Sequence, residues 1–257
     1  MSKVAVVIPA RYASTRLPAK PLLSIAGIPL IQHVWERCSR ARGIDRVIVA
    51  TDDMRIADAA FGFGAEVSLT SPKHRSGTDR VAEVVKKLRG ISHVINVQGD
   101  EPLVEPALVT RLAETMLGDR KIQMATAASV FGPDDDIDNP NAVKVVIGRD
   151  GDALYFSRSR IPYLRDDGVR PAWRRHLGIY GYTKKCLLQF VQWKPSSLEL
   201  AESLEQLRAL ENGIRIRVLP ARHAAVGVDT PEDVAAVERL LAPKKNRREK
   251  AQTAQKG

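Results

Sequence analysis

Short apolar runs alternate with helical patterns through the first half of the chain. The runs Val4–Ile8, Val47–Ala50, Glu66–Leu69 and Val94–Val97 have the length of buried strands. Strands that alternate with helices form βαβ units around a mostly parallel sheet, so we predict an α/β fold. The helices predicted in this half cover residues 30–41, 54–61, 76–89 and 105–117.

The second half predicts a different arrangement. Beyond Ile122, strand-like runs at 122–130, 143–147, 152–157 and 177–183 follow one another with few helical patterns between them. This spacing favours a mixed sheet with an inserted antiparallel part. The chain then returns to helices at 184–192 and 199–212, a strand at 214–219, and a last helix from Thr230 that ends before Pro243. In the helix predicted at 199–212, one side is formed by Leu200, Leu204, Leu207 and Leu210.

The charge of the chain is unevenly distributed. The net charge is +10, and half of it lies in residues 243–257, which hold six Lys or Arg and no Val, Ile, Leu, Met or aromatic residue. Such a segment cannot bury an apolar face, so we predict a disordered basic tail. The chain has neither interleaved aromatic residues nor a recognition-helix pattern. We therefore expect no required nucleic-acid partner, and a solubilising tail rather than a binding one.

The cellular compartment is predicted from two features. No apolar run reaches the length that spans a bilayer, and the N-terminus lacks the pattern of a signal peptide. Cys38 and Cys186 are far apart and belong to no CxxC motif, so they are expected to be packing residues. Together these features predict a cytoplasmic protein.

The loop after the first strand is rich in cations and hydroxyls. It contains Arg11, Ser14, Arg16 and Lys20, and it is punctuated by prolines. Guanidinium, ammonium and hydroxyl groups suit the oxygens of a polyphosphate, although a solvated surface loop is the alternative interpretation. The loop lacks the GxxxxGK[ST] pattern, so it is not a P-loop.

Three predicted strands end in polar residues on what should be one edge of the sheet. Pro9–Arg11, Thr51–Asp52 and Gln98–Asp100 follow these strands, and ligands of α/β sheets bind at that edge. Asp100 and Asp229 are candidate ligands of Mg²⁺, which is held by carboxylates together with substrate phosphates. For each carboxylate, a helix-capping or surface role is the alternative.

Nine segments, taken in order, resemble the 3-deoxy-manno-octulosonate cytidylyltransferases, the CMP-Kdo synthetases of Gram-negative bacteria. The resemblance runs from about residue 4 to 240. The segments are PARYASTRLPAKPL (9–22), VATDD (49–53), SGTDRVAEV (76–84), VQGDEP (97–102), NPNAVKVV (139–146), ALYFSR (153–158), RHLGIYGY (175–182), LEQLRALENG (204–213) and GVDTPED (227–233).

This resemblance implies a Rossmann-like, GT-A-like nucleotidyltransferase that acts as a homodimer. Such an enzyme joins CTP and 3-deoxy-D-manno-octulosonate (Kdo), giving CMP-Kdo and pyrophosphate for lipopolysaccharide assembly, with Mg²⁺ as cofactor. The domain would span residues 1–242, with a dimerisation and sugar-binding insertion at about 122–183. A cytidylyltransferase for another 2-keto sugar acid, such as 8-amino-Kdo or a sialic acid, is the alternative.

The resemblance also implies roles for individual residues. The catalytic and metal-binding set would be Arg11, Lys20, Asp100 and Asp229, the last two as metal ligands. The nucleotide would meet Ala10, Arg11, Ser14, Lys20, Ser76, Gly77, Arg80 and Gln98, with Arg16 a further candidate. The sugar acid would meet Gln98, His176, Tyr180 and Glu205.

Two positions depart from the family pattern, and His176 has two possible roles. Ala19 stands where the family commonly has glycine, and Asp79 where glutamate is usual, so we expect a slightly altered phosphate loop and Arg80 position. His176 has the chemistry of a general base, but a metal-bound alkoxide needs no separate base. We therefore favour a hydrogen-bonding or packing role for His176.

Overall fold

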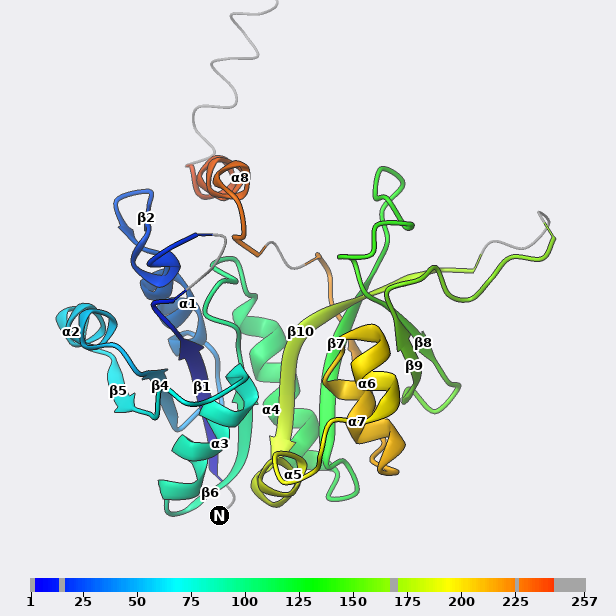
Figure 1. Cartoon of the computed structure of the whole chain (residues 1–257), viewed down its shortest axis with the longest axis horizontal. Coiled ribbons are helices and arrows are strands. Elements are labelled where there is room, and N and C mark those ends of the chain that lie inside the picture. Colours follow the sequence, from blue (N-terminus) through cyan, green and yellow to red (C-terminus); the bar gives the residue numbers. More distant parts are fainter. Residues whose placement is uncertain (1–2, 14–16, 167–170, 225–226, 243–257) are drawn as a thin grey trace, which may run out of the picture.

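The protein is an α/β structure with helices on both faces of one large mixed sheet (Figure 1). The computed structural model describes residues 3–13, 17–166, 171–224 and 227–242. The N-terminal half contains β1 (Lys3–Ala10), the 3₁₀-helix η1 (Lys20–Leu22), β2 (Ser24–Ile25), β3 (Ile28–Pro29), α1 (Leu30–Ser39), β4 (Arg46–Thr51), α2 (Met54–Gly62), β5 (Glu66–Leu69), α3 (Gly77–Lys87), β6 (Ile91–Asn96) and α4 (Pro106–Gly118). The C-terminal half contains β7 (Met124–Val130), β8 (Lys144–Ile147), β9 (Ala153–Ser157), β10 (Arg174–Thr183), α5 (Lys184–Phe190), α6 (Ser197–Glu202), α7 (Gln206–Glu211), β11 (Ile216–Pro220) and α8 (Pro231–Leu241).

The main sheet confirms the predicted mixed architecture. Its strand order is β11-β7-β10-β6-β1-β4-β5, and β6, β1, β4 and β5 run parallel. β10 is antiparallel to both β6 and β7, while β11 is parallel to β7. The antiparallel pair β8–β9 joins the sheet through β10. The polar ends of β1, β4 and β6 therefore lie on one edge, as predicted.

Alternate residues of β1 explain why the sheet is covered on both faces. Val4, Val6 and Ile8 pack with residues of α1, α2 and α4 on one face. Ala5 and Val7 pack with residues of α3, α5 and α7 on the other. Because both faces of β1 are buried, its sequence is continuously apolar rather than alternating.

β1 extends beyond the predicted boundary at Pro9. Pro9 and Ala10 pair with Ala50 and Thr51 of β4. Pairing with β6 ends at Val7, whose carbonyl accepts a hydrogen bond from Val97. The backbone nitrogen of Pro9 points toward β6, as the carbonyl of Val7 does. Pairing between β1 and β6 has already ended at this position, so the N–H group that proline lacks is not needed for the sheet.

The prediction of one helix over 199–212 is wrong. The chain forms two short helices, α6 and α7, because Ser203 adopts a left-handed conformation with φ of 51°. Leu200 is 69% exposed and belongs to no apolar face, whereas Leu204 and Leu207 are buried.

Candidate active site

A cavity of about 300 Å³ opens at the carboxyl ends of β1 and β6. It is lined by residues from these two strand ends, from the N-terminus of α3 and from the segment before α8. The predicted nucleotide and metal residues that line it are Ala10, Arg11, Lys20, Ser76, Gly77, Arg80, Gln98, Asp100 and Asp229. Ser14 and Arg16 lie outside the described residues.

Lys20 joins the two predicted metal ligands. Its Nζ lies 2.6 Å from Oδ2 of Asp100 and 3.0 Å from Oδ1 of Asp229. Burial works against the charge of Lys20, but the two carboxylates outweigh it and hold its pKa above the ordinary value. Residues 80 and 209 positions away from Lys20 in the chain thus meet at one cation.

The position of Asp229 follows from the local sequence. Thr230 is the N-cap of α8 and accepts a hydrogen bond from the Asp233 N–H, with Pro231 in the first turn. The Asp233 carboxylate accepts hydrogen bonds from the N–H groups of Asp229 and Thr230. Val228 is fully buried, and its N–H donates to the carbonyl of Asp100. Asp229 is therefore not the helix cap, and its side chain faces Lys20.

Gly99 allows the loop after β6 to pass close to β1. A Cβ at this position would lie 2.7 Å from the carbonyl oxygen of Pro9, a distance that real Cβ atoms do not adopt. Only glycine fits, so the QGD segment brings Asp100 against the end of β1 because residue 99 has no side chain.

Arg80 is held beneath the cavity by two partners. It is 4% exposed; one guanidinium nitrogen lies 3.1 Å from Oδ2 of Asp52, and another donates to the hydroxyl of Thr70. The neighbouring Asp79 donates its N–H to the side chain of Ser76, the N-cap of α3. The Asp79 departure from the family pattern thus lies at the helix cap, and Asp52 and Thr70 hold Arg80.

A second cavity, of about 370 Å³, adjoins the first. It contains the predicted sugar-acid residues Gln98, His176, Tyr180 and Glu205. Gln98 lines both cavities, so the two pockets meet at this side chain. The structure brings together every predicted sugar-acid residue.

The aromatic wall of the second cavity is neutral. Burial lowers the pKa of His176 to about 3, and the ring nitrogen Nε2 lies 3.0 Å from the hydroxyl of Thr126. Burial, followed by the charge of Glu205, holds the pKa of Tyr180 above its ordinary value. An uncharged imidazole with so low a pKa is a poor general base, which supports the hydrogen-bonding role expected for His176.

Several residues of the two cavities were missed by the sequence reasoning. His74 and Arg75 line the first cavity, and Thr78, Glu101, Asn141 and Gln206 line the second. Arg175, the first residue of the RHLGIYGY segment, belongs to an arginine-rich stretch that the sequence had already indicated, and it lines the second cavity as well. Burial, followed by the charge of Asp100, raises the pKa of Glu101 to about 8. Glu101 directly follows Asp100 and Gln206 follows Glu205, so adjacency to predicted residues was the available signal.

The two carboxylates that surround the Lys20 ammonium group have the chemistry to hold a hard divalent cation. Asp100 and Asp229 supply carboxylate oxygens, and an ammonium group already lies between them. Among the described residues no group of three or more His, Cys, Asp or Glu forms a complete metal cage. Two carboxylates completed by substrate oxygens are the arrangement that Mg²⁺ uses with phosphate substrates.

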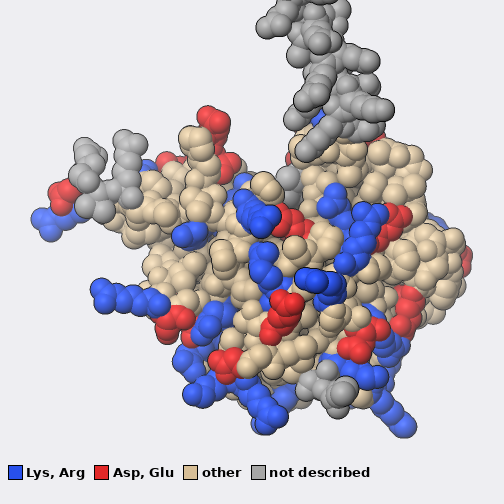
Figure 2. All heavy atoms as spheres, turned by 180° about the vertical axis from the view of Figure 1, so that it is seen from behind, with Lys and Arg blue, Asp and Glu red and all other residues tan. Residues whose placement is uncertain are grey.

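The surface outside the two cavities carries charges of both signs. On the face shown in Figure 2, acidic side chains lie among the basic ones. In the described part of the chain, none of the helices combines the length and apolarity needed to cross a bilayer. Cys38 and Cys186 are free and buried, as expected for packing residues, while the predicted basic tail lies outside the described residues.

The fold and the paired cavities define a nucleotidyltransferase. A family model described as "Cytidylyltransferase" matches residues 5–216. The chain is 49% identical to 3-deoxy-manno-octulosonate cytidylyltransferase 2 of Actinobacillus pleuropneumoniae serotype 5b, over 94% of this chain and all of that protein. It is 47% identical to 3-deoxy-manno-octulosonate cytidylyltransferase of Geobacter sulfurreducens, over 91% of this chain and 97% of that protein.

The solved structures agree. The CMP:2-keto-3-deoxy-manno-octonic acid synthetase complexed with CTP superposes with a TM-score of 0.90 at 44% identity, over 94% of this chain and 99% of that one. A cytidylyltransferase from Leptospira borgpetersenii shares the fold, with a TM-score of 0.63 at 17% identity, over 93% of this chain and 86% of that one. The chain belongs to the 3-deoxy-manno-octulosonate cytidylyltransferases.

Proposed function

We propose that this enzyme transfers CMP from CTP to Kdo, producing CMP-Kdo and pyrophosphate for lipopolysaccharide assembly. The observation that carries the proposal is the junction of the two cavities at Gln98, within a chain that belongs to this family. One cavity has the cations that a triphosphate requires, and the other has the polar wall that a sugar acid requires. The junction is where the two substrates would meet.

The residues of the first cavity would bind and orient CTP. Arg11 and Lys20 supply positive charge for the phosphates, and Ser76 and Gly77 present the N-terminus of α3 to the same space. The anomeric hydroxyl of Kdo attacks the α-phosphorus, and pyrophosphate leaves. This reaction needs little covalent participation by the protein, so positioning and charge stabilisation account for catalysis.

The residues of the second cavity would bind Kdo. His176 and Tyr180 offer neutral hydrogen-bonding groups, and Glu205 offers an acceptor for sugar hydroxyls. Arg175 supplies a cation for the carboxylate of the sugar acid.

Asp100 and Asp229 would hold Mg²⁺ in this enzyme. Their two carboxylates suit a hard cation whose remaining ligands are substrate oxygens. When bound, the metal supplies charge neutralisation to phosphate and alkoxide oxygens.

Release of pyrophosphate tests the substrate assignment. The purified enzyme is assayed with CTP, UTP, ATP and GTP against Kdo, 8-amino-Kdo and a sialic acid, and the product is identified by mass spectrometry. We expect efficient turnover for the pair CTP and Kdo. Faster turnover with 8-amino-Kdo or sialic acid would instead assign the alternative sugar acid.

We also propose that the enzyme works as a cytoplasmic homodimer. The two buried free cysteines suit a reducing compartment. Val130, Leu154 and Tyr163 are 50%, 63% and 85% exposed on the segments around β7–β10, where a second copy would cover them. Light scattering during size-exclusion chromatography measures the mass directly, and a mass of one chain would overturn the dimer.

A further inference from the structure

We infer that Thr78 is a positioning residue, which holds the carboxylate of Glu205 in the orientation that binds the sugar acid. The inference rests on the proposed function of the second cavity. No role for Thr78 follows from the family resemblance described above, and its hydroxyl does not belong to the phosphate-binding set.

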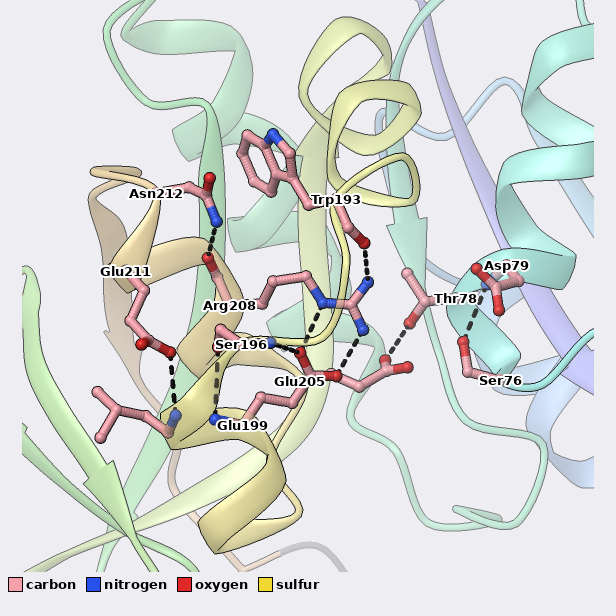
Figure 3. Close-up of polar contacts among 11 residues, drawn as sticks. Ser76, Thr78, Asp79, Trp193, Ser196, Glu199, Glu205, Arg208, Glu211 and Asn212 are labelled. Carbon is pink, nitrogen blue, oxygen red and sulfur yellow. Dashed lines mark hydrogen bonds and ion pairs between the residues drawn. The ribbon is translucent and has the colours of Figure 1, made fainter.

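The contact joins two elements that are far apart in the chain. Thr78 lies in the first turn of α3 and is 6% exposed. Its hydroxyl oxygen lies 2.7 Å from Oε2 of Glu205, which directly precedes α7 (Figure 3). Both residues line the second cavity. A donated hydrogen bond to one carboxylate oxygen fixes the carboxylate plane and leaves the second oxygen for a ligand.

The backbone at Glu205 is fixed by a different contact. Arg208 of α7 donates to the Glu199 carboxylate of α6, with Nε lying 2.6 Å from Oε2, and to the carbonyl of Trp193 at 3.2 Å. Both charged side chains are 10% exposed. This ion pair holds α7 against α6, as Figure 3 shows. The hydrogen bonds to Glu199, with smaller contributions from the charges of Glu199 and Glu205, hold the pKa of Arg208 above its ordinary value. The hydrogen bonds of the Arg208 guanidinium go to Glu199 and Trp193, whereas the Thr78 hydroxyl donates to the Glu205 carboxylate.

Thr78 is not required as a helix cap. Ser76 is the N-cap of α3, and its hydroxyl accepts the Asp79 N–H at 3.1 Å. The Thr78 hydroxyl is thus directed to Glu205 rather than to its own helix. Because Ser76 and Gly77 line the first cavity, the Thr78–Glu205 bond also links the nucleotide side to the sugar side.

The test replaces the hydroxyl by a methyl group. Thr78→Val keeps the volume and β-branching of the side chain but removes the donor. We expect the KM for Kdo to rise about ten- to hundredfold, the range for a lost hydrogen bond to a charged group, while the KM for CTP changes less than about twofold. Thr78→Ser retains the donor and should restore most of the loss.

Thr110→Val is the matched control. Thr110 is also 6% exposed in a helix, and its hydroxyl accepts the Arg42 N–H at 2.9 Å, away from both cavities. This variant should lower the melting temperature about as much as Thr78→Val does, without changing either KM.

A double-mutant cycle with Glu205→Ala completes the test. If Thr78 acts through Glu205, the double variant should be no worse for Kdo than Glu205→Ala alone. An unchanged KM for Kdo in Thr78→Val, an equal rise for both substrates, or full additivity with Glu205→Ala would overturn the inference. If Thr78→Val does not fold, failure of the Ser variant to retain the wild-type KM for Kdo would overturn it. Turnover of CTP and Kdo by the wild-type enzyme tests the proposed function separately.

Discussion

Lys20 lies between two carboxylates, Asp100 and Asp229, and reduces their mutual repulsion in the first cavity. Asp100 and Asp229 were predicted because each lies in a segment of the family pattern, Asp100 directly after Gly99 and Asp229 two residues after Gly227. Their contact with Lys20 was not predicted, because a pattern along the chain does not show which separate loops meet. α8 packs near β2, which forms a short antiparallel pair with β3. This packing brings the loop that carries Asp229 into the site.

Removal of either cation should impair catalysis. We expect Arg11→Ala or Lys20→Ala to lower kcat/KM for CTP by about tenfold to a thousandfold, which corresponds to about 1.4–4 kcal/mol. Steady-state kinetics measure the effect, and Lys121→Ala, an exposed cation outside both cavities, is the control. Unchanged kinetics in both variants would return this loop to the surface-loop interpretation.

The two carboxylates should act as one unit. Asp100→Asn and Asp229→Asn keep the side-chain size but remove the charge that would hold Mg²⁺ in the proposed site, so each should abolish CMP-Kdo formation while CTP still binds. The double variant should be little worse than either single one. Turnover is followed against Mg²⁺ concentration, and CTP binding is measured separately by calorimetry. Near-wild-type turnover of Asp229→Asn at ordinary Mg²⁺ would refute the shared site.

Ala19 adopts the backbone conformation that favours glycine. Its φ is 58°, which explains why the family commonly has glycine at this position. We expect Ala19→Gly to relieve this strain and to raise the free energy of unfolding by about 1 kcal/mol. Urea denaturation provides the measurement, with Ala107→Gly in the exposed first turn of α4 expected to change stability in the opposite direction. A stability loss at Ala19 would show that the loop gains nothing from glycine.

At the scale of elements, the strands were predictable and the α6–α7 turn was not. Continuous apolar runs with flanking turn residues have one simple solution, a strand buried on both faces, and β1, β4 and β6 follow it. β5 lies at the edge of the sheet, and its first and last residues, Glu66 and Leu69, are exposed. Residues 199–212 satisfied a helical period, but the chain breaks at Ser203 because tertiary contacts favour the turn. Arg158 makes these contacts, and it donates to the carbonyls of Glu202 at 2.6 Å and Ser203 at 3.3 Å.

Arg158 also binds the segment that carries Asn141, a residue of the second cavity. It donates to the carbonyl of Pro140 at 3.0 Å, close to the cavity residue Asn141. Arg158→Met should lower the free energy of unfolding by about 2 kcal/mol, because three carbonyls lose a charged donor. Urea denaturation measures this effect, and Arg160→Ala, which removes a cation stacked on Trp173, is the control. Equal losses in both variants would show that Arg158 has no special role at this turn.

At the scale of the whole molecule, much of the positive charge lies outside the helices and strands of the fold. Half of the net charge lies in residues 243–257, which follow α8 and cannot bury an apolar face. Truncation after Leu241 should therefore leave turnover and melting temperature nearly unchanged. Kinetics and calorimetry of the two proteins provide the comparison, and a large loss of either would show that the tail docks on the folded part.

β10 pairs with three other strands of the sheet and also lines the second cavity. It pairs with β7 from Arg174 onward, changes register between Leu177 and Tyr180, and then pairs with β6. The irregularity lies at the second cavity, next to Gly178. From Arg174 to Tyr180 the strand measures roughly 20 Å at about 3.3 Å per residue. In mechanical terms, a displacement of the outer end of this strand would be transmitted through its backbone to His176 and Tyr180, which lie on β10 and line the second cavity.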